Sequence, residues 1–415
     1  MSALSEDALP GDMPIPELLE EGHRVIDWIG DYLAGVAERP VLARVAPGQV
    51  AASLPLEAPE EPTGMEAILA DLTTGILPGI THWNHPAFFA YFATTGSGPG
   101  ILAEAICAAL NVNAMVWRSS PAATELEERA LEWLRQMLGL PEGLRGHIQD
   151  TASTSTLVAL LAAREASGLD IRDRGLGGRE LPPLRIYCSE EAHSSVEKAG
   201  IVLGIGREGV RRIPTDERFR MRADELAAAI AEDRAAGRRP IAVVATIGTT
   251  STTSIDPLPD IGAICSRERV WLHVDAAYGG SAAVIPEMRG VLEGVEMADS
   301  LVVNPHKWLF VPLDCSALFF RDPSVARAAL SLVPEYLKTP EGEGVTNLMD
   351  YGPALGRRFR ALKLWMVLRY FGRAGLAERL REHLRLAREL AQWVDEHPQW
   401  ERMAPVPFST VCFRH

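Results

Sequence analysis

Cysteine is scarce in this sequence and follows no pattern. The five cysteines of the 415-residue chain are Cys107, Cys188, Cys265, Cys315 and Cys412. No two of them have Cys-x-x-Cys spacing, so the sequence holds no obvious zinc site, and an odd, scattered set gives no disulfide framework. We therefore expect reduced thiols, no metal site and a cytoplasmic protein.

Long apolar runs and an excess of positive charge are also missing. No uninterrupted hydrophobic stretch is long enough to cross a bilayer. Glu6 and Asp7 precede the first apolar run, which is unlike a secretory signal. The 41 basic and 55 acidic residues give a net charge of −14. This balance argues against nucleic acid and membranes as partners, and an anionic ligand would need a local pocket of oriented donors.

Short β-branched runs alternate with helical patterns between about Gly98 and Phe320. Four of these runs are almost continuously hydrophobic, namely residues 185–188, 241–246, 270–274 and 301–303. Such runs are typical of strands in a parallel sheet that helices cover on both faces. The sequence therefore predicts an α/β fold with a central, mostly parallel sheet, whose ligand binds beyond the carboxyl ends of the strands.

The length of the chain favours one large domain with smaller appendages. Residues 15–36 have helical apolar spacing, and a proline-rich stretch follows Pro40. We expect residues 1–97 to form an N-terminal helical arm that docks on the main body or on a partner subunit. Residues 98–362 would form the large α/β domain, and residues 363–415 the start of a small C-terminal domain that this sequence leaves incomplete.

A lysine follows one predicted strand in apolar and aromatic surroundings. Lys307 stands next to Trp308, a few residues beyond the run 301–303. Burial lowers the pKa of a lysine, and a neutral amine can form a Schiff base with an aldehyde. The alternative is a lysine whose ammonium group reaches the solvent.

An acid follows another predicted strand directly. Asp275 comes just after the run 270–274. It could cap the next turn, or it could keep a pyridine nitrogen protonated, as pyridoxal phosphate requires to act as an electron sink. Because Asp275 and Lys307 stand at the ends of different strands, both can face one crevice.

Two further segments suit a phosphorylated aromatic cofactor. Hydroxyl-rich residues 151–156 open an apolar helix, whose free N–H groups can bind phosphate, although an ordinary N-cap has the same pattern. Asn304 and Thr250 could supply further donors. His193 follows another strand, where an imidazole can stack on a planar ring, although a structural histidine is the alternative.

One glycine motif points elsewhere. Residues 204–209 fit the pattern G-x-G-x-x-G, but they follow a helical segment at 196–202 and precede a strand at 210–213. A dinucleotide site needs the order strand, glycines, helix. We therefore do not interpret this motif as a dinucleotide site.

Seven segments occur along the chain in an order that matches a known family. They are residues 85–86 (HP), 89–92 (FAYF), 120–127 (SPAATELE), 192–195 (AHSS), 248–250 (GTT), 273–278 (HVDAAY) and 304–308 (NPHKW). With them the chain resembles the group II pyridoxal-phosphate-dependent amino-acid decarboxylases, in the aromatic-L-amino-acid decarboxylase branch. The resemblance implies a fold-type-I, PLP-dependent transferase-like homodimer with interface active sites, and residues 98–362 as the domain that binds pyridoxal 5'-phosphate.

The resemblance also implies roles for individual residues. Lys307 would form the Schiff base, Asp275 would pair with the pyridine nitrogen, and His193 would stack on the ring. Tyr336 matches a loop tyrosine that protonates the substrate carbon after CO₂ leaves. The implied cofactor-binding residues are Lys307, Asp275, His193, Ala152, Ser153, Asn304, Thr250, Ala277 and His306, and the implied substrate-binding residues are Trp83, Tyr91, Phe92 and Thr94.

The implied activity is decarboxylation of an aromatic L-amino acid, such as Trp, Phe, Tyr or dihydroxyphenylalanine, to the amine. Relatives that form aldehydes commonly replace the loop tyrosine or the stacking histidine. This chain retains both Tyr336 and His193, which favours simple decarboxylation. The alternatives are an aromatic aldehyde synthase, a decarboxylase of a non-aromatic amino acid such as His or Glu, and a protein that binds the cofactor without turnover.

Overall fold

The computed structural model describes residues 12–92, 94–332 and 344–415, and the chain divides into two compact units. The first unit ends at Tyr91 and the second begins at Phe92. Within the described ranges, no helix is both long and apolar enough to span a membrane. The domain boundaries expected after residues 97 and 362 stay predictions.

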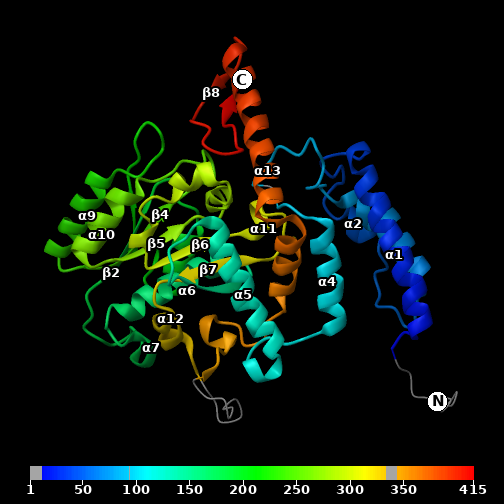
Figure 1. Cartoon of the computed structure of the whole chain (residues 1–415), viewed down its shortest axis with the longest axis horizontal. Helices are drawn as coiled ribbons and strands as arrows, with labels where there is room; N and C mark the ends of the chain where they lie inside the picture. The colour runs from blue at the N-terminus through cyan, green and yellow to red at the C-terminus, as the bar shows by residue number, and fades with distance from the viewer. Residues whose placement is uncertain (1–11, 93, 333–343) are drawn as a thin grey trace. The chain divides into compact units, whose positions relative to one another are not determined.

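The first unit is helical. Its α-helices are α1 (Ile15–Gly35), α2 (Gln49–Ala52) and α3 (Met65–Asp71), drawn at the blue end of the chain (Figure 1). Helix α1 confirms the prediction over residues 15–36. Pro16 lies in its first turn, where a backbone N–H would have no partner within the helix, so the proline removes no hydrogen bond. Within this unit Tyr32 pairs its hydroxyl with Nδ1 of His82 at 3.0 Å.

A seven-stranded sheet forms the centre of the second unit (Figure 1). Adjacent strands are parallel except at β7, which runs antiparallel to both of its neighbours. This is the mostly parallel α/β sheet that the sequence predicts. In spatial order the strands are β1 (Arg145–Gln149), β7 (Ser316–Phe320), β6 (Ser300–Val303), β5 (Trp271–Asp275), β4 (Arg239–Thr246), β2 (Leu184–Ser189) and β3 (Val210–Ile213).

Helices cover both faces of this sheet. Helices α6 and α8 pack on the face that carries Ala242 and Val244, whereas α5, α9 and α10 pack on the face that carries Val243 and Ala245. The helices of this unit are α4 (Gly98–Leu110), α5 (Pro121–Leu138), α6 (Ala152–Ala166), α7 (Ile171–Arg174), α8 (Ser195–Val202), α9 (Ala223–Ala235), α10 (Leu258–Glu268), α11 (Pro305–Trp308), α12 (Pro323–Leu330) and α13 (Arg360–Glu396). The short strands β8 (Glu401–Arg402) and β9 (Phe413–Arg414) pair separately.

Burial on both faces explains the hydrophobic runs in the sequence. Successive side chains of a strand point to opposite faces, so a strand covered on both sides buries nearly all of them, as β4 does from residue 240 to residue 246. The four predicted runs lie in β2, β4, β5 and β6. Residues 204–209 lie between α8 and β3, which confirms that their context is not that of a dinucleotide site.

Candidate active site

The carboxyl ends of β4, β5 and β6 open onto one cavity of about 150 Å³. These strands are parallel neighbours, so the residues that follow them meet at the same edge of the sheet. The cavity is lined by all nine residues predicted to bind the cofactor: Lys307, Asp275, His193, Ala152, Ser153, Asn304, Thr250, Ala277 and His306.

Of the other predicted site residues that the structure describes, only one lines this cavity. Phe92 lines the same cavity, whereas Thr94 does not. Trp83 and Tyr91 belong to the first unit, where their rings stack with centroids 5.6 Å apart. Tyr336 lies outside the described residues. The roles of all five residues in substrate binding and proton transfer stay predictions.

Lys307 reaches the cavity from the short helix α11, which begins directly after β6 and Asn304. Its Nζ lies 5.2 Å from the centroid of the Phe92 ring. Burial lowers the pKa of Lys307, and the carboxylate of Asp275 opposes that shift only in part. In the described part of the chain, Nζ forms no ion pair. A buried amine with a lowered pKa and no ion pair is more readily neutral, and the neutral amine is the form that acts as a nucleophile.

Asp275 ends β5 and is 6% exposed. The backbone N–H of Ala277 donates to its Oδ1 at 3.2 Å. Among the described residues this carboxylate has no other hydrogen-bond donor, so Oδ2 is available to a ligand. A buried, unpaired carboxylate of this kind suits a cationic ring nitrogen, since burying a charge without a partner is costly.

His193 is held by the turn that leads into α8. The backbone N–H of Ser195 donates to its Nδ1 at 3.2 Å, and the Ser195 hydroxyl lies 2.9 Å from the same atom. Burial lowers the pKa of His193, Asp275 raises it, and Lys307 lowers it further. Because Nδ1 accepts a hydrogen bond from a backbone N–H, the neutral ring carries its proton on Nε2.

The N-terminus of α6 lines one side of the cavity. Helix α6 begins at Ala152, and its N-cap residue Thr151 makes no side-chain cap. Ala152 and Ser153 line the cavity, and within the described structure their N–H groups have no acceptor, as at other helix N-termini that can bind phosphate. His306 stands nearby and accepts from the N–H of Cys315 at 2.9 Å. Burial, reinforced by Lys307, lowers the pKa of His306 to about 4, so its ring is neutral.

Four further cavity residues received no individual role from the sequence: Thr151, Thr246, Gly248 and Tyr278. Thr151 lies in the hydroxyl-rich segment 151–156, and Gly248 and Tyr278 lie in two of the segments that carry the resemblance. Thr246 ends β4, and its Oγ1 is buried without a hydrogen-bond partner in the described structure. The rule that drew attention to Asp275, a polar residue at the end of an apolar run, would also have found Thr246.

Tyr278 belongs to an aromatic column beneath the cavity, formed by Phe92, Tyr278, Trp308 and Phe408. Tyr278 stacks on Phe92 with ring centroids 4.2 Å apart and on Trp308 at 4.8 Å. Phe408 meets both Tyr278 and Trp308 edge to face. The column therefore supports the segment that carries Lys307.

These groups fit pyridoxal phosphate. The cavity offers a lysine amine for the aldehyde, an unsatisfied carboxylate for the ring nitrogen, and a free helix N-terminus for the phosphate. The orphaned Thr246 Oγ1 is a further polar atom that a ligand would satisfy.

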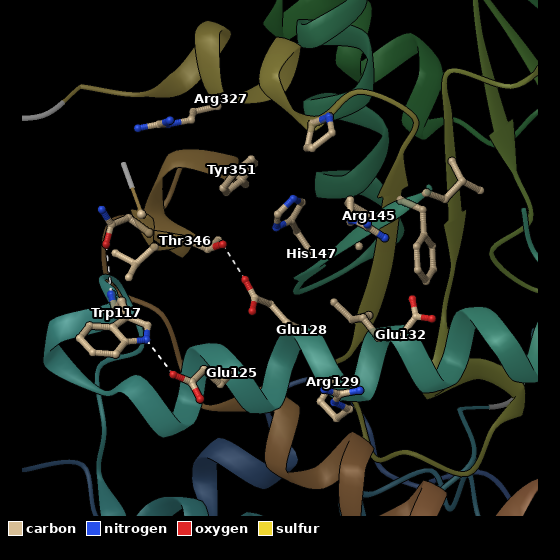
Figure 2. Close-up of a pocket in the computed structure, with 18 residues that line it drawn as sticks. Trp117, Glu125, Glu128, Arg129, Glu132, Arg145, His147, Arg327, Thr346 and Tyr351 are labelled. Carbon is tan, nitrogen blue, oxygen red and sulfur yellow. Dashed lines mark hydrogen bonds between the residues drawn. The ribbon is translucent and has the colours of Figure 1, made fainter. Parts of the chain in front are cut away.

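A larger cavity, of about 1050 Å³, lies at β1, α5 and residues 344–351 (Figure 2). His147 stacks on Tyr351 there with centroids 3.8 Å apart, and Thr346 donates to Glu128 at 2.5 Å. Burial lowers the pKa of His147 to about 3. None of the described residues predicted for the active site lines this cavity, and no lysine is among its described lining residues. Volume alone therefore does not identify the reactive site.

Comparisons with known proteins agree with this geometry. The family model described as "Pyridoxal-dependent decarboxylase conserved domain" matches residues 47–415. The chain is 44% identical to aromatic-L-amino-acid decarboxylase of Sus scrofa, over 97% of this chain and 85% of that protein. It is 41% identical to phenylacetaldehyde synthase of Arabidopsis thaliana, over 97% and 83%. The structure of Oryza sativa TDC with PLP and tryptamine matches with a TM-score of 0.94 and 37% identity, over 98% and 85%.

Proposed function

This chain belongs to the pyridoxal-dependent decarboxylase family, and we propose that it converts an aromatic L-amino acid to the corresponding arylalkylamine and CO₂. It is a fold-type-I, PLP-dependent amino-acid carboxy-lyase, as the resemblance in the sequence implies. The observation that carries the proposal is that Lys307 and Asp275, from different strands, line one cavity.

Three side chains divide the work in this proposal. Lys307 holds the cofactor through its amine, Asp275 keeps the pyridine nitrogen protonated, and His193 lies against the ring. When bound, pyridoxal phosphate supplies an electron sink for the bond to the departing carboxyl group. The N–H groups at the start of α6, with Asn304, hold the phosphate. Phe92 offers an apolar ring to the substrate side.

Tyr336 is proposed, on the resemblance alone, to return a proton to the substrate carbon. Trp83, Tyr91 and Thr94 are proposed on the same basis to contact the substrate ring. A cytoplasmic homodimer with active sites at the subunit interface is part of the same proposal. Light scattering on the purified protein tests the dimer, because the monomer mass is 45.2 kDa.

A product screen tests the activity. The purified holoenzyme is incubated with Trp, Phe, Tyr and dihydroxyphenylalanine, and with His and Glu as contrasts, while CO₂ and amine are measured. The proposal expects amine and CO₂ in equal amounts from at least one aromatic substrate. Turnover of only His or Glu, or cofactor binding without CO₂ release from any of the six, would overturn it.

A second candidate function follows from the aldehyde-forming relative in Arabidopsis thaliana. An aldehyde synthase would release ammonia and peroxide together with CO₂. Retention of His193 and Tyr336 favours the amine product, and measuring ammonia and peroxide in the same reactions separates the two functions.

A further inference from the structure

His273 lies directly behind the acid of the active site, on the same strand. It stands two residues before Asp275 in β5, so both side chains project from the same face of the sheet. His273 is 0% exposed and does not line the cofactor cavity. Burial lowers the pKa of His273 to about 4 against the opposing effect of Asp275, so its imidazole is neutral.

A chain of hydrogen bonds determines which ring nitrogen carries the proton. The indole Nε1–H of Trp271, which can only donate, donates to the Ser300 hydroxyl oxygen at 2.9 Å. The same oxygen lies 2.9 Å from Nδ1 of His273. In the described structure the Ser300 hydroxyl has no other acceptor, so its own proton goes to Nδ1. Of the two neutral tautomers, the one that lets the Ser300 hydroxyl donate carries the ring proton on Nε2.

That Nε2–H has no acceptor among the described residues. Buried donors are nearly always satisfied, by protein or by an ordered water. The carboxylate of Asp275 is the matching group on the same face of the strand, because it accepts only the N–H of Ala277. A donor without an acceptor and an acceptor with a free oxygen thus stand side by side on β5.

We propose that His273 is a positioning residue, which donates from Nε2 to the Asp275 carboxylate through one ordered water. The bond keeps the carboxylate aimed at the cofactor ring nitrogen, as orienting partners do for the groups of a binding site. This role rests on the proposed function, in which Asp275 acts on that nitrogen. It extends the site along β5 to a side chain that touches neither cofactor nor substrate.

Two isosteric substitutions separate this role from a purely structural one. The amide nitrogen of Gln reaches about as far as Nε2 of a histidine, whereas that of Asn reaches only as far as Nδ1. We expect His273→Asn to weaken pyridoxal phosphate binding to the apoprotein roughly tenfold, the lower end of what removal of an orienting partner costs. We expect it to lower kcat and leave KM nearly unchanged. His273→Gln should retain wild-type affinity within about threefold, because it keeps the distal donor.

A double-mutant cycle tests whether His273 acts through Asp275. Affinity for pyridoxal phosphate, measured by fluorescence titration of the apoproteins, is compared for His273→Asn, Asp275→Asn and the double variant. If the carboxylate carries the effect, His273→Asn should change nothing further in the Asp275→Asn background. Additive losses would overturn the proposal.

One control and one substitute variant separate a specific effect on cofactor binding from a general loss of stability. His147→Gln removes another buried strand histidine, which does not line the cofactor cavity, and should leave cofactor affinity unchanged. If His273→Asn does not fold, Ser300→Ala is tested in its place. Loss of the Ser300 hydroxyl lets the ring proton of His273 move from Nε2 to Nδ1, which should also weaken cofactor binding. Equal losses in the Gln and Asn variants, or no loss in either, would sink the proposal. Because the readout is binding, it stands even where the wild-type protein releases no CO₂.

Discussion

Lys307 and Asp275 reach one cavity from adjacent parallel strands, with Asp275 at the end of β5 and Lys307 in the helix that follows β6. The pairing of β5 with β6 keeps the two groups in register, because main-chain hydrogen bonds place Asp275 opposite Val302. The backbone of the paired strands therefore sets the distance between Lys307 and Asp275 that a cofactor would bridge, and the two side chains supply the groups that bind it.

Lys307→Ala should abolish turnover. It should also abolish the cofactor absorbance at about 400 nm and above, which is typical of a pyridoxal ring bound to a lysine. The fold should persist, because removing a buried amine that lacks an ion pair leaves no other charge unpaired. Absorbance spectra, CO₂ release and far-UV circular dichroism check the three outcomes. Lys198→Ala, on the exposed side of α8, is the control and should keep both activity and absorbance. Wild-type turnover in Lys307→Ala would refute the assignment.

His147 should make stability depend on pH. Burial, with Arg357 adding to the effect, lowers its pKa from 6.5 to about 3. Between these two values the imidazole is protonated in the unfolded chain and neutral in the folded chain. The stabilising contribution is full above pH 6.5 and is lost as the pH falls toward 3. His147→Leu should therefore reduce the pH slope of the unfolding free energy by about 1.4 kcal/mol per unit between those limits.

Urea titrations at several pH values measure that slope. The matched control is His23→Leu, which removes an exposed histidine of α1 and should leave the slope as it is in the wild type. Identical slopes for wild type and His147→Leu would show that the buried ring does not resist protonation.

Gly279→Ala should destabilise the turn after β5. A Cβ at this position would lie 2.6 Å from the backbone oxygen of Ile247 and 2.7 Å from the Phe408 ring, so either the turn or the aromatic column must shift. We expect a loss of about 1–3 kcal/mol in unfolding free energy. Gly290→Ala is the control, because nothing lies within 4 Å of its added Cβ. Equal melting temperatures for the two variants would contradict the predicted clash.

Arg357→Met should be strongly destabilising. The side chain of Arg357 is 8% exposed and pairs at 3.0 Å with Glu127, which is 2% exposed. Both also bond to the backbone of Ile148 in β1, with Arg357 donating to its oxygen and Glu127 accepting from its N–H. Loss of the arginine leaves a buried carboxylate unpaired, which typically costs about 3–5 kcal/mol.

Adding Glu127→Gln to Arg357→Met should recover part of that loss, because the uncompensated charge is gone. Thermal unfolding of the two variants provides the comparison. Arg385→Met, which breaks an exposed ion pair on α13 with Glu382, should cost only a small part as much. A double variant less stable than Arg357→Met would contradict this account.

The sequence predicted the site well where chemistry follows directly from local pattern. Asp275 and Lys307 each come at or soon after an apolar run, so their strands and their exits could be identified together. Thr246 was overlooked although it too ends an apolar run, because a threonine carries no charge that distinguishes it from an ordinary strand residue. Its place in the cavity depends on strand order, which periodicity does not contain.

Two strands of the sheet also gave no clear signal. In β1 the sequence holds Arg145, His147 and Gln149, and burial of this polar strand depends on the Tyr351 ring and the Glu127–Arg357 pair. In β7 the run 316–320 is hydrophobic, but its antiparallel direction is visible only from its pairing with β1 and β6. Contacts between distant segments decide both features.

The aromatic column has a consequence for how the protein is made. Its rings come from positions 92, 278, 308 and 408, so nearly the whole second unit must have left the ribosome before the last of them can dock. Contacts between such distant positions form slowly compared with local ones. Until Phe408 docks, the aromatic column beside the segment that carries Lys307 therefore lacks its last ring, so this part of the site is completed late in folding.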